Sequence, residues 1–221
     1  MKCRSCESCE CYLVFDMGTA PPSNAFLSQN EINKAEKYYP LRLFICKNCW
    51  LLQTEDFFEA DDLFVDDYPY FSSFSSTFKS HCSNYCDGIV ERFAISSKSR
   101  LLEIASNDGY LQDIFRKKNL DLIGIEPTGA AAQIAIGKGH KVHTTFFGSS
   151  FANKLVDIGG KFDLIVANNV LAHVPNINDF ASGMKKCLRK TGVITVENAS
   201  SMKLIKNYLF DTVYHEHYSY L

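Results

Sequence analysis

This 221-residue sequence has no long apolar run, no signal-peptide pattern, no internal repeat and no surplus of positive charge. Because a membrane-spanning helix needs about 18 or more consecutive apolar residues, the sequence predicts a cytosolic protein without a membrane segment. The formal net charge is −2, so a general attraction to nucleic acid or to an anionic membrane is not expected. The acidic stretch 55–67 argues further against binding to a phosphate backbone.

Cysteine, by contrast, is plentiful and unevenly placed. Six of the nine cysteines lie before residue 50, a layout typical of a metal-binding module rather than of a secreted disulfide framework. Hydrophobic residues make up 46% of the chain, which is enough for a sizeable core. The sequence therefore predicts a small metal-binding module joined to one medium-sized domain.

Alternation of apolar runs with helical spacing predicts an α/β fold in the larger part of the chain. A helix is expected over 76–93, and helices are expected between most of the strands that follow. The five expected strands are 100–105, 121–126, 141–145, 162–171 and 192–198. Apolar strands separated by helices are typical of a doubly wound parallel sheet. We therefore divide the chain into a zinc-binding domain with its linker, 1–75, and a Rossmann-like domain, 76–221.

Two Cys-x-x-Cys pairs carry the metal prediction. Four thiolates offered by two tight turns form the ligand set of a structural zinc site, which leaves no open position for chemistry. Cys9 and Cys11 lie near the first pair and are alternative ligands. The four expected ligands are Cys3, Cys6, Cys46 and Cys49.

The loop after the first strand of the expected sheet is where a doubly wound fold binds its ligand. It contains a single glycine, Gly109, rather than the Gly-x-Gly-x-x-Gly of dinucleotide enzymes. Asn107 and Asp108 precede that glycine, and an aspartate there repels phosphate but suits a cationic ligand such as S-adenosylmethionine. Glu126 ends the second strand, where a carboxylate hydrogen-bonds ribose hydroxyls. The alternative is that Asp108 is only a helix N-cap.

Several separated motifs resemble those of the nucleotide-sugar C-methyltransferases of deoxysugar pathways, which methylate C3 of a 4-keto-dideoxy sugar carried on a nucleoside diphosphate. Besides the two cysteine pairs, they are YPYFSS (68–73), EIASNDGYL (103–111), GIEP (124–127), FFG (146–148), NNVLAHVP (168–175) and FDTVYHEHYSY (210–220). The resemblance implies a zinc-binding N-terminal domain, a Rossmann-like domain that binds S-adenosylmethionine, and a C-terminal domain.

The resemblance also implies roles for individual residues. The base is expected to be His217 or Glu216, with Tyr214 as a donor and His173 near cofactor or sugar, while Tyr68 and Tyr70 contact the sugar. The implied cofactor-binding residues are Glu103, Ala105, Asn107, Asp108, Gly109, Glu126, Pro127, Phe147, Asn168 and Asn169. Other interpretations remain open. His173 can hydrogen-bond a loop, Tyr68 and Tyr70 can serve packing alone, and His215 and His217 can form a zinc pair.

The sequence departs from the family by ending at Leu221, before the C-terminal domain and the last strands of the sheet. We therefore expect an incomplete sheet and a chain that binds cofactor but methylates weakly. Two rival functions stay open. One is an inactive fragment that binds S-adenosylmethionine but lacks the sugar site. The other, of a different class, is a zinc-ribbon protein that binds or modifies RNA, although Lys and Arg do not gather around the cysteine pairs. The sequence leaves the oligomeric state and the identity of the sugar open.

Overall fold

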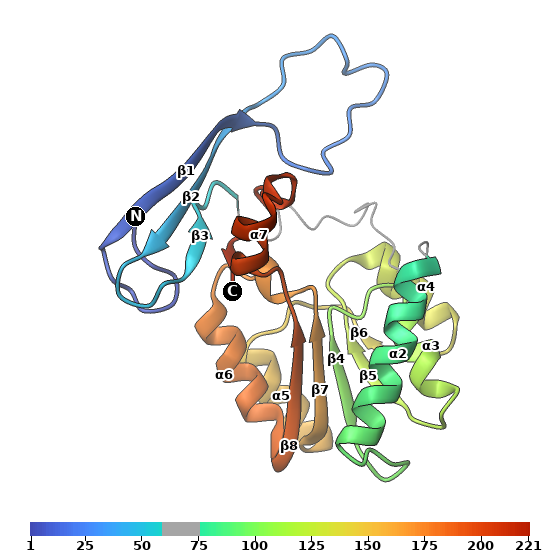
Figure 1. Cartoon of the computed structure of the whole chain (residues 1–221). Coiled ribbons are helices and arrows are strands. Elements are labelled where there is room, and N and C mark those ends of the chain that lie inside the picture. Colours follow the sequence, from blue (N-terminus) through green and yellow to red (C-terminus); the bar gives the residue numbers. More distant parts are fainter. Residues whose placement is uncertain (59–75) are drawn as a thin grey trace. The chain divides into compact units, whose positions relative to one another are not determined.

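The computed structural model of the chain describes residues 1–58 and 76–221 (Figure 1). These residues form two compact units, which are described separately below. Unit 1 contains the described residues of Met1–Leu63 together with Asn169–Asn178 and Asn198–Leu221. Unit 2 contains the described residues of Phe64–Asn168 together with Asp179–Glu197. Both units are discontinuous in sequence, whereas the division made from the sequence is at residue 75.

Unit 2 is built on a five-stranded sheet in which every pairing is parallel. Its strands are β4 (Leu101–Ile104), β5 (Leu122–Ile125), β6 (Lys141–His143), β7 (Phe162–Asn168) and β8 (Leu188–Glu197). They lie in the order β6-β5-β4-β7-β8, so the chain runs outward from β4 to one edge and then from β7 to the other. The α/β fold class is confirmed, and the order places the topological switch point between β4 and β7.

Helices cover both faces of this sheet, with α2 and α3 on one side and α5 and α6 on the other (Figure 1). The helices are α2 (Ser76–Arg92), α3 (Tyr110–Arg116), α4 (Gly129–Gly137), α5 (Ser149–Gly159) and α6 (Ile177–Cys187). Because both faces are covered, the strands can be apolar on both sides. All four residues of β4 are buried, as are four consecutive residues of β7.

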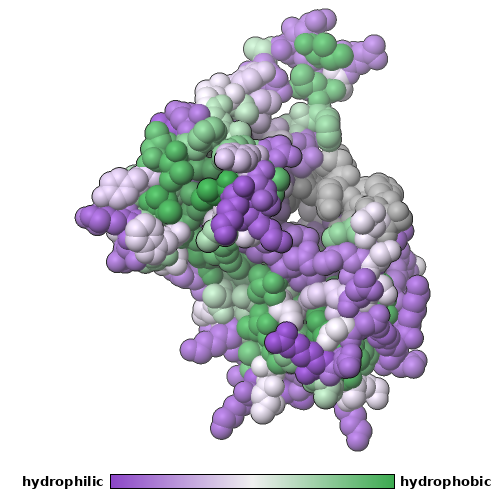
Figure 2. Space-filling view, in the orientation of Figure 1, coloured by the Kyte–Doolittle hydropathy of each residue, from purple (hydrophilic) through white to green (hydrophobic). Residues whose placement is uncertain are grey.

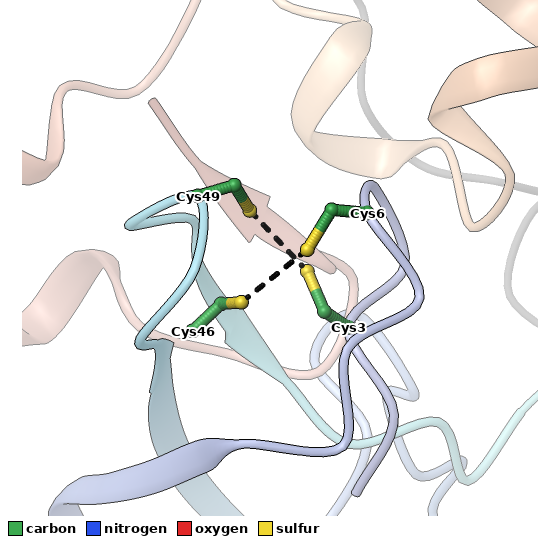
Figure 3. Close-up of side chains that lie close together, drawn as sticks. All are labelled: Cys3, Cys6, Cys46 and Cys49. Atoms are coloured by element: carbon green, nitrogen blue, oxygen red, sulfur yellow. Dashed lines mark hydrogen bonds between the residues drawn. The ribbon is translucent and has the colours of Figure 1, made fainter.

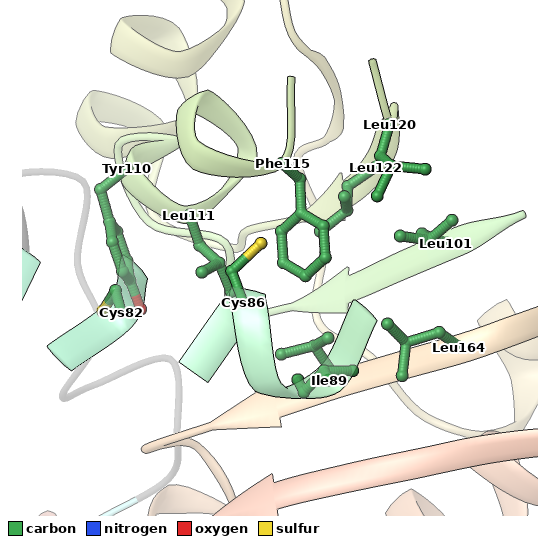
Figure 4. Close-up of a cluster of buried hydrophobic side chains, with 11 residues drawn as sticks. Cys82, Cys86, Ile89, Leu101, Tyr110, Leu111, Phe115, Leu120, Leu122 and Leu164 are labelled. Atoms are coloured by element: carbon green, nitrogen blue, oxygen red, sulfur yellow. The ribbon is translucent and has the colours of Figure 1, made fainter. Parts of the chain in front are cut away.

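The core under α2 and α3 is shown in Figure 4. Cys86 and Ile89 of α2 pack with Leu111 and Phe115 of α3 over Leu101 of β4. Phe115 and Leu111 are completely buried. The thiol of Cys86 belongs to this cluster, and burial raises its pKa to about 11, which keeps it protonated and inert.

The sequence did not place every element of unit 2 correctly. The strand expected over 162–171 ends at Asn168, because Asn169 adopts a left-handed backbone conformation with φ of 53°. Helix α5 was not expected; it buries Ala152 and Leu155 and leaves Ile158 exposed. Strand β8 begins at Leu188, directly after α6, rather than at residue 192.

Unit 1 is built on a four-stranded antiparallel sheet in the order β1-β2-β3-β9. The strands are β1 (Cys11–Ala20), β2 (Tyr39–Cys46), β3 (Leu52–Thr54) and β9 (Ser219–Tyr220). Three short helices belong to this unit: η2 (Leu171–His173), α7 (Ser201–Asn207) and η3 (Phe210–Thr212). The end of the chain therefore supplies the fourth strand of the sheet whose other strands lie within the first 54 residues.

The core of unit 1 joins distant parts of the sequence. Leu43 of β2 and Leu52 of β3 pack with Leu204, Val213 and Tyr220 in one buried cluster. On the outer strand β1, by contrast, large apolar side chains are exposed, and Figure 2 shows apolar surface gathered over the β1–β2 hairpin. These residues are Tyr12, Leu13, Val14, Phe15 and Met17. Such an apolar edge strand is uncommon on an isolated domain.

Within residues 1–58 and 76–221, none of the helices combines the length and the apolar character needed to cross a membrane.

Candidate functional site

The four cysteines expected to bind zinc come together in unit 1 (Figure 3). Their sulfur atoms all lie within 4.8 Å of one another, and the sulfurs of the Cys3–Cys49 and Cys6–Cys46 pairs are 3.5 Å apart. Tetrahedral zinc with bonds of about 2.3 Å to sulfur places its ligands about 3.8 Å from each other. The arrangement therefore matches a closed structural zinc site.

Neither alternative cysteine belongs to this quartet. Cys9 is exposed, and the sulfur of Cys11 lies near the carbonyl of Ser8 and accepts a hydrogen bond from the side-chain amide of Gln53. In the described part of the chain, the quartet is the one group of three or more ligating side chains close enough to hold a metal ion.

In unit 2, the loop between β4 and α3 is tightly wound. Ala105, Asn107 and Gly109 have positive φ angles of 59°, 49° and 79°. Gly109 cannot be replaced without strain, because a Cβ there would lie 2.8 Å from the ring of His140. Helix α3 begins directly after Gly109 without a side-chain cap, so the structure gives no capping role to Asp108.

Glu126 holds this loop from the end of β5. One carboxylate oxygen accepts a hydrogen bond from the main-chain N–H of Asn107 at 2.8 Å, and the other accepts from the N–H of Thr128 at 2.9 Å and from its hydroxyl. Each carboxylate oxygen has two lone-pair sites, so capacity for further donors is left. Thr128, which sequence reasoning missed, therefore orients the carboxylate expected to bind ribose.

Glycine 124 allows the loop to approach β5 closely. It pairs with Glu103 across the parallel sheet, and a Cβ there would lie 2.5 Å from the hydroxyl of Ser106. The same side chain would crowd the amide of Gln112, which donates to the carbonyl of Leu122. The glycine of the GIEP motif therefore serves a steric purpose that the sequence alone did not reveal.

Three carboxylates, those of Glu103, Asp108 and Glu126, gather at the carboxyl ends of β4 and β5, and each residue is at most 4% exposed. Burial, with the charges of the other two, raises the pKa of Glu103 well above its usual range. Burial also raises the pKa of Glu126, although hydrogen bonds from Thr128 and Asn107 oppose the shift.

Within the described residues, one oxygen of Glu103 and one of Asp108 are buried without a hydrogen-bond partner. Buried acceptors of this kind need donors, and their crowding favours a positive charge. The amino and sulfonium groups of S-adenosylmethionine supply a donor and positive charge, so the residues present fit this cofactor.

The other residues expected at the cofactor site are less closely connected to this cluster. Asn168 ends β7, and its side-chain oxygen is buried without a partner among the described residues. Pro127 follows Glu126 directly, and Phe147 packs edge-to-face on Phe180 of α6. Asn169 is exposed and belongs to unit 1, as the first residue after β7.

The terminal motif 210–220 is firmly anchored in unit 1, although chain ends are usually frayed. Thr54 of β3 donates its hydroxyl to the carbonyl of His217 at 2.8 Å, and β9 follows immediately in the sheet. Tyr218 and Tyr220 are each 1% exposed. Arg4 lies over the Tyr218 ring, 5.2 Å from its centre. The sequence reasoning missed both Thr54 and Arg4, because nothing local links them to the terminus.

Two histidines and a tyrosine of this motif form a compact cluster in unit 1. The ring of His217 packs against that of His173 with centroids 4.6 Å apart, and its Nε2 hydrogen-bonds the hydroxyl of Tyr214 at 2.8 Å. His173 belongs to η2, and its ring hydrogen-bonds the main chain of Glu216. The structure thus brings together all four residues expected to be catalytic.

Burial lowers the pKa of His173 to about 4. Burial also lowers the pKa of His217 to about 3, and the neighbouring His173 ring adds to the shift. Both imidazoles are therefore neutral near pH 7. A neutral imidazole is the form that can accept a proton.

The Glu216 side chain, 1% exposed, points to different partners. One of its oxygens accepts hydrogen bonds from the hydroxyl of Ser23 at 2.9 Å and from the side-chain amide of Asn24 at 2.8 Å. These two donors come from the segment between β1 and β2 and were not predicted. A carboxylate occupied in this way is a weaker candidate for the base than His217.

The alternative of a zinc pair formed by His215 and His217 is wrong. It assumed an extended strand, but residues 214–217 form a turn in which the N–H of His217 bonds the carbonyl of Tyr214. The ring of His215 bonds the carbonyl of Pro40 and packs among Tyr39 and Phe58. The remaining expected contacts, Tyr68 and Tyr70, lie outside the described residues.

The zinc geometry leads to a first prediction. The purified protein should hold about one zinc ion per chain, measured by elemental analysis after gel filtration, and Cys49→Ser should lose it because one of four ligands is removed. Cys9→Ser is the matched control and should keep the metal. Since β9 belongs to the same unit, chelation should increase hydrogen exchange at residues 214–220 as well as at 1–54. Full zinc occupancy in Cys49→Ser would contradict the ligand set.

The histidine cluster leads to a second prediction, on the free energy of unfolding. The folded-state pKa values of about 4 and 3 lie below the ordinary value of 6.5, so between these limits the unfolded chain binds protons that the folded chain does not. The contribution of the two neutral imidazoles to the free energy of unfolding is complete above pH 6.5. It is lost as the pH falls toward 4, by at most about 1.4 kcal/mol per pH unit for each histidine.

Urea titrations between pH 7.5 and 5, followed by the fluorescence of Trp50, measure this dependence, because Trp50 is the one tryptophan of the chain and lies in unit 1. We expect His217→Asn to flatten the acid slope of the wild type. Parallel slopes for the two proteins would contradict the burial of a neutral imidazole.

Comparison with known proteins agrees with a zinc site in the first part of the chain and a cofactor-binding domain in the rest. Residues 3–64 match a family described as a putative zinc-binding domain, and residues 78–221 match a family described as a methyltransferase domain. The latter match extends over well over half of the chain.

Among curated proteins, the chain is 27% identical over 219 residues to the C-methyltransferase NovU of Streptomyces niveus, covering 99% of this chain and 52% of that protein. It is 28% identical over 119 residues to a ubiquinone biosynthesis O-methyltransferase of Rhodopseudomonas palustris, covering 50% of this chain and 46% of that protein. The chain thus spans about half the length of the curated relatives it matches.

Among solved structures, an S-adenosylmethionine-dependent methyltransferase from Clostridium acetobutylicum aligns with 58% of this chain and 54% of its own, at 16% identity and a TM-score of 0.47. The zinc-binding segment and the four clustered cysteines establish zinc as one cofactor, and the methyltransferase domain establishes S-adenosylmethionine as the other. The chain belongs to the methyltransferase domain family, with a zinc-binding domain preceding the methyltransferase domain.

Proposed function

We propose that this chain carries out S-adenosylmethionine-dependent C-methylation, at C3 of a 4-keto-deoxysugar carried on a nucleoside diphosphate. The observation that carries the proposal is the cluster of His173, Tyr214 and His217, two neutral imidazoles beside a phenol in a partly buried setting. The similarity to a C-methyltransferase along 99% of the chain supports it, and the resemblance of the separated motifs supports the choice of sugar.

Methylation at carbon differs from methylation at oxygen in what it demands of the protein. The carbon next to a ketone becomes a nucleophile only after it loses a proton, so a base and a donor for the resulting enolate oxygen are both needed. His217 offers a neutral ring nitrogen, and Tyr214 offers a hydroxyl held 2.8 Å from that ring. We assign His217 as the base and Tyr214 as the donor.

The proposed reaction balances without a metal or an oxidant. His217 takes the proton from C3, and the electrons of the broken C–H bond enter the enolate. When bound, S-adenosylmethionine supplies the methyl group from its sulfonium, and the sulfur keeps the electron pair of the broken bond. The carbon–methyl bond forms at C3, the C4 ketone is restored, and the proton on His217 passes to solvent.

The low pKa of His217 bears on how strong this base is. A pKa of about 3 keeps the ring available as an acceptor but makes it weakly basic. A nucleoside diphosphate carries negative charge, and negative charge near an imidazole raises its pKa. The proposed substrate would therefore strengthen the base on binding, which a neutral substrate would not.

For the cofactor, we propose that Glu126 binds the ribose hydroxyls and that Glu103 and Asp108 face the cationic methionine portion. Their unpartnered buried oxygens and mutual crowding support this assignment. Asn107, whose main-chain N–H bonds Glu126, and Asn168 at the end of β7 complete the proposed crevice of unit 2.

A third prediction tests the cofactor assignment. Glu126→Ala should weaken binding of S-adenosylhomocysteine by roughly 1.5–3 kcal/mol, because a buried charged acceptor is lost. Calorimetric titration measures the change, and Asp121→Ala, an exposed carboxylate just before β5, is the control. Unchanged affinity in Glu126→Ala would mean that the ribose binds elsewhere.

A fourth prediction tests the base. His217→Asn in the full-length protein should lower turnover of 4-keto sugar nucleotides by roughly 10²–10⁴-fold, the usual contribution of a general base. Binding of S-adenosylhomocysteine should not change, because the proposed cofactor residues lie in unit 2. His81→Asn, which alters an exposed histidine, serves as the matched control. Wild-type rates in His217→Asn would exclude this histidine as the base.

A further inference from the structure

The segment between β1 and β2 of the zinc-binding sheet reaches the acid–base cluster through one carboxylate. Ser23 and Asn24 both donate to the same oxygen of Glu216, at 2.9 and 2.8 Å. Ser23 is partly buried and Asn24 is largely exposed, whereas Glu216 is 1% exposed. Two neighbouring residues of a long loop thus converge on one buried carboxylate that is nearly 200 residues distant in sequence.

Glu216 occupies a central position in the cluster. Its main chain bonds the ring of His173, and the next residue is His217. The turn 214–217 is closed by the hydrogen bond from the N–H of His217 to the carbonyl of Tyr214. Because side chain and main chain of Glu216 are joined in one short turn, a shift of its carboxylate moves the residues on both sides.

We infer that Ser23 and Asn24 are positioning residues for the acid–base site, and that they act by holding the Glu216 carboxylate. This inference rests on the proposed function and adds to it a task for the zinc-binding domain. The pairing of Ala20 with Tyr39 in the β1–β2 hairpin, whose other end carries the zinc cysteines, holds the base of the loop. Ser23 and Asn24 then hold Glu216, and Glu216 holds the turn that bears Tyr214 and His217.

The chemistry of the contact requires hydrogen-bond donors, and both of the donors present are neutral. The hydroxyl of Ser23 and the amide of Asn24 can each offer a hydrogen to an ionised carboxylate, and hydrogen bonds to charged groups are about twice as strong as neutral ones. An aspartate at position 24 would have almost the same shape but would place a second carboxylate against Glu216. Two carboxylates in contact cannot both ionise without repulsion, so one of them would retain a proton.

Among the described residues, the titratable groups next to Glu216 are three imidazoles and the phenol of Tyr214. His173 of η2 bonds its main chain, and His215 and His217 flank it in the terminal motif. None of these three becomes a negative charge at neutral pH. A pH response that appears on replacing Asn24 by aspartate would therefore report the new carboxylate pair.

The test uses the full-length, zinc-loaded protein and begins with the contact itself, which is independent of catalysis. Asn24→Asp should raise the unfolding equilibrium constant, measured through Trp50 fluorescence, by about 10-fold at pH 8 and much less at pH 5. Combining it with Glu216→Gln should remove this pH-dependent difference. Asn30→Asp, an exposed residue of the same loop, makes the same change of charge and should show neither effect.

The second measurement is turnover of 4-keto sugar nucleotides. Asn24→Ala combined with Ser23→Ala should lower kcat by about 10–100-fold, since a displacement of about 1 Å in a catalytic group has an effect of that order. Affinity for S-adenosylhomocysteine should stay within about twofold. Asn24→Asp should lose more activity at pH 8 than at pH 6, which a merely structural role would not produce, and Asn30→Asp should behave as wild type.

The outcomes separate the inference from the function on which it rests. Absence of coupling between Asn24→Asp and Glu216→Gln would overturn the contact and with it the inference. Coupling with unchanged kcat in the alanine variants would overturn the positioning role while leaving the proposed function intact. If the variants show coupling but the wild-type protein turns over none of these substrates, the proposed function is overturned and the positioning role with it.

Discussion

The pairing of β9 with β3 is the contact on which the proposed acid–base site depends. It ties residues 219–220 to residues 52–53 and thereby makes the end of the chain part of the zinc-binding sheet. Thr54 reinforces the pairing from its side chain, and Tyr220 adds its ring to the buried cluster beneath. A two-residue strand is too short to be stable by itself, so its position depends on the strands and on the metal that order the rest of the sheet.

Because β9 depends on the rest of the sheet, the structural zinc also bears on the position of the terminal motif. The quartet of cysteines contains no open coordination site, so the metal takes no part in bond making. It joins the two strand ends at the open end of the β1–β2 hairpin, because Cys3 and Cys6 precede β1 and Cys46 ends β2 beside Cys11. The same hairpin carries the loop with Ser23 and Asn24. In the proposed site, the closed metal site therefore acts on Ser23 and Asn24 only through the paired strands between them.

Unit 2 is governed by a different constraint, the crowding of three carboxylates at the ends of β4 and β5. Burying three carboxylates together is costly, and Gly109 and Gly124 let the loop that carries Asp108 wind tightly against β5, where Lys138 lies 3.9 Å from the Asp108 carboxylate. Thr128 and the N–H of Asn107 neutralise part of the charge on Glu126, but Glu103 and Asp108 keep buried oxygens for a donor from outside the described residues. A cationic cofactor bound at the proposed site would offset this crowding.

The sequence predicted those features that depend on local pattern. Strands β4, β5 and β7 are apolar runs long enough to recognise, and two Cys-x-x-Cys pairs together are typical of a zinc site. Strand β1 has no buried face to give it an alternating pattern, and β3 and β9 are only three and two residues long, so the strands of unit 1 lack the long apolar runs of the parallel sheet.

The terminal motif shows the limit most clearly. Its residues were recognised by resemblance, but its partners, Ser23, Asn24 and Thr54, are 160 or more positions away, and antiparallel pairing over that distance leaves no signal in a single sequence. His215 and His217 share a spacing that suits a strand, yet the turn between them sends one ring into an aromatic cluster and the other to Tyr214. Which histidine can take a proton is therefore decided by tertiary contacts, and the sheet of unit 1 is what supplies them.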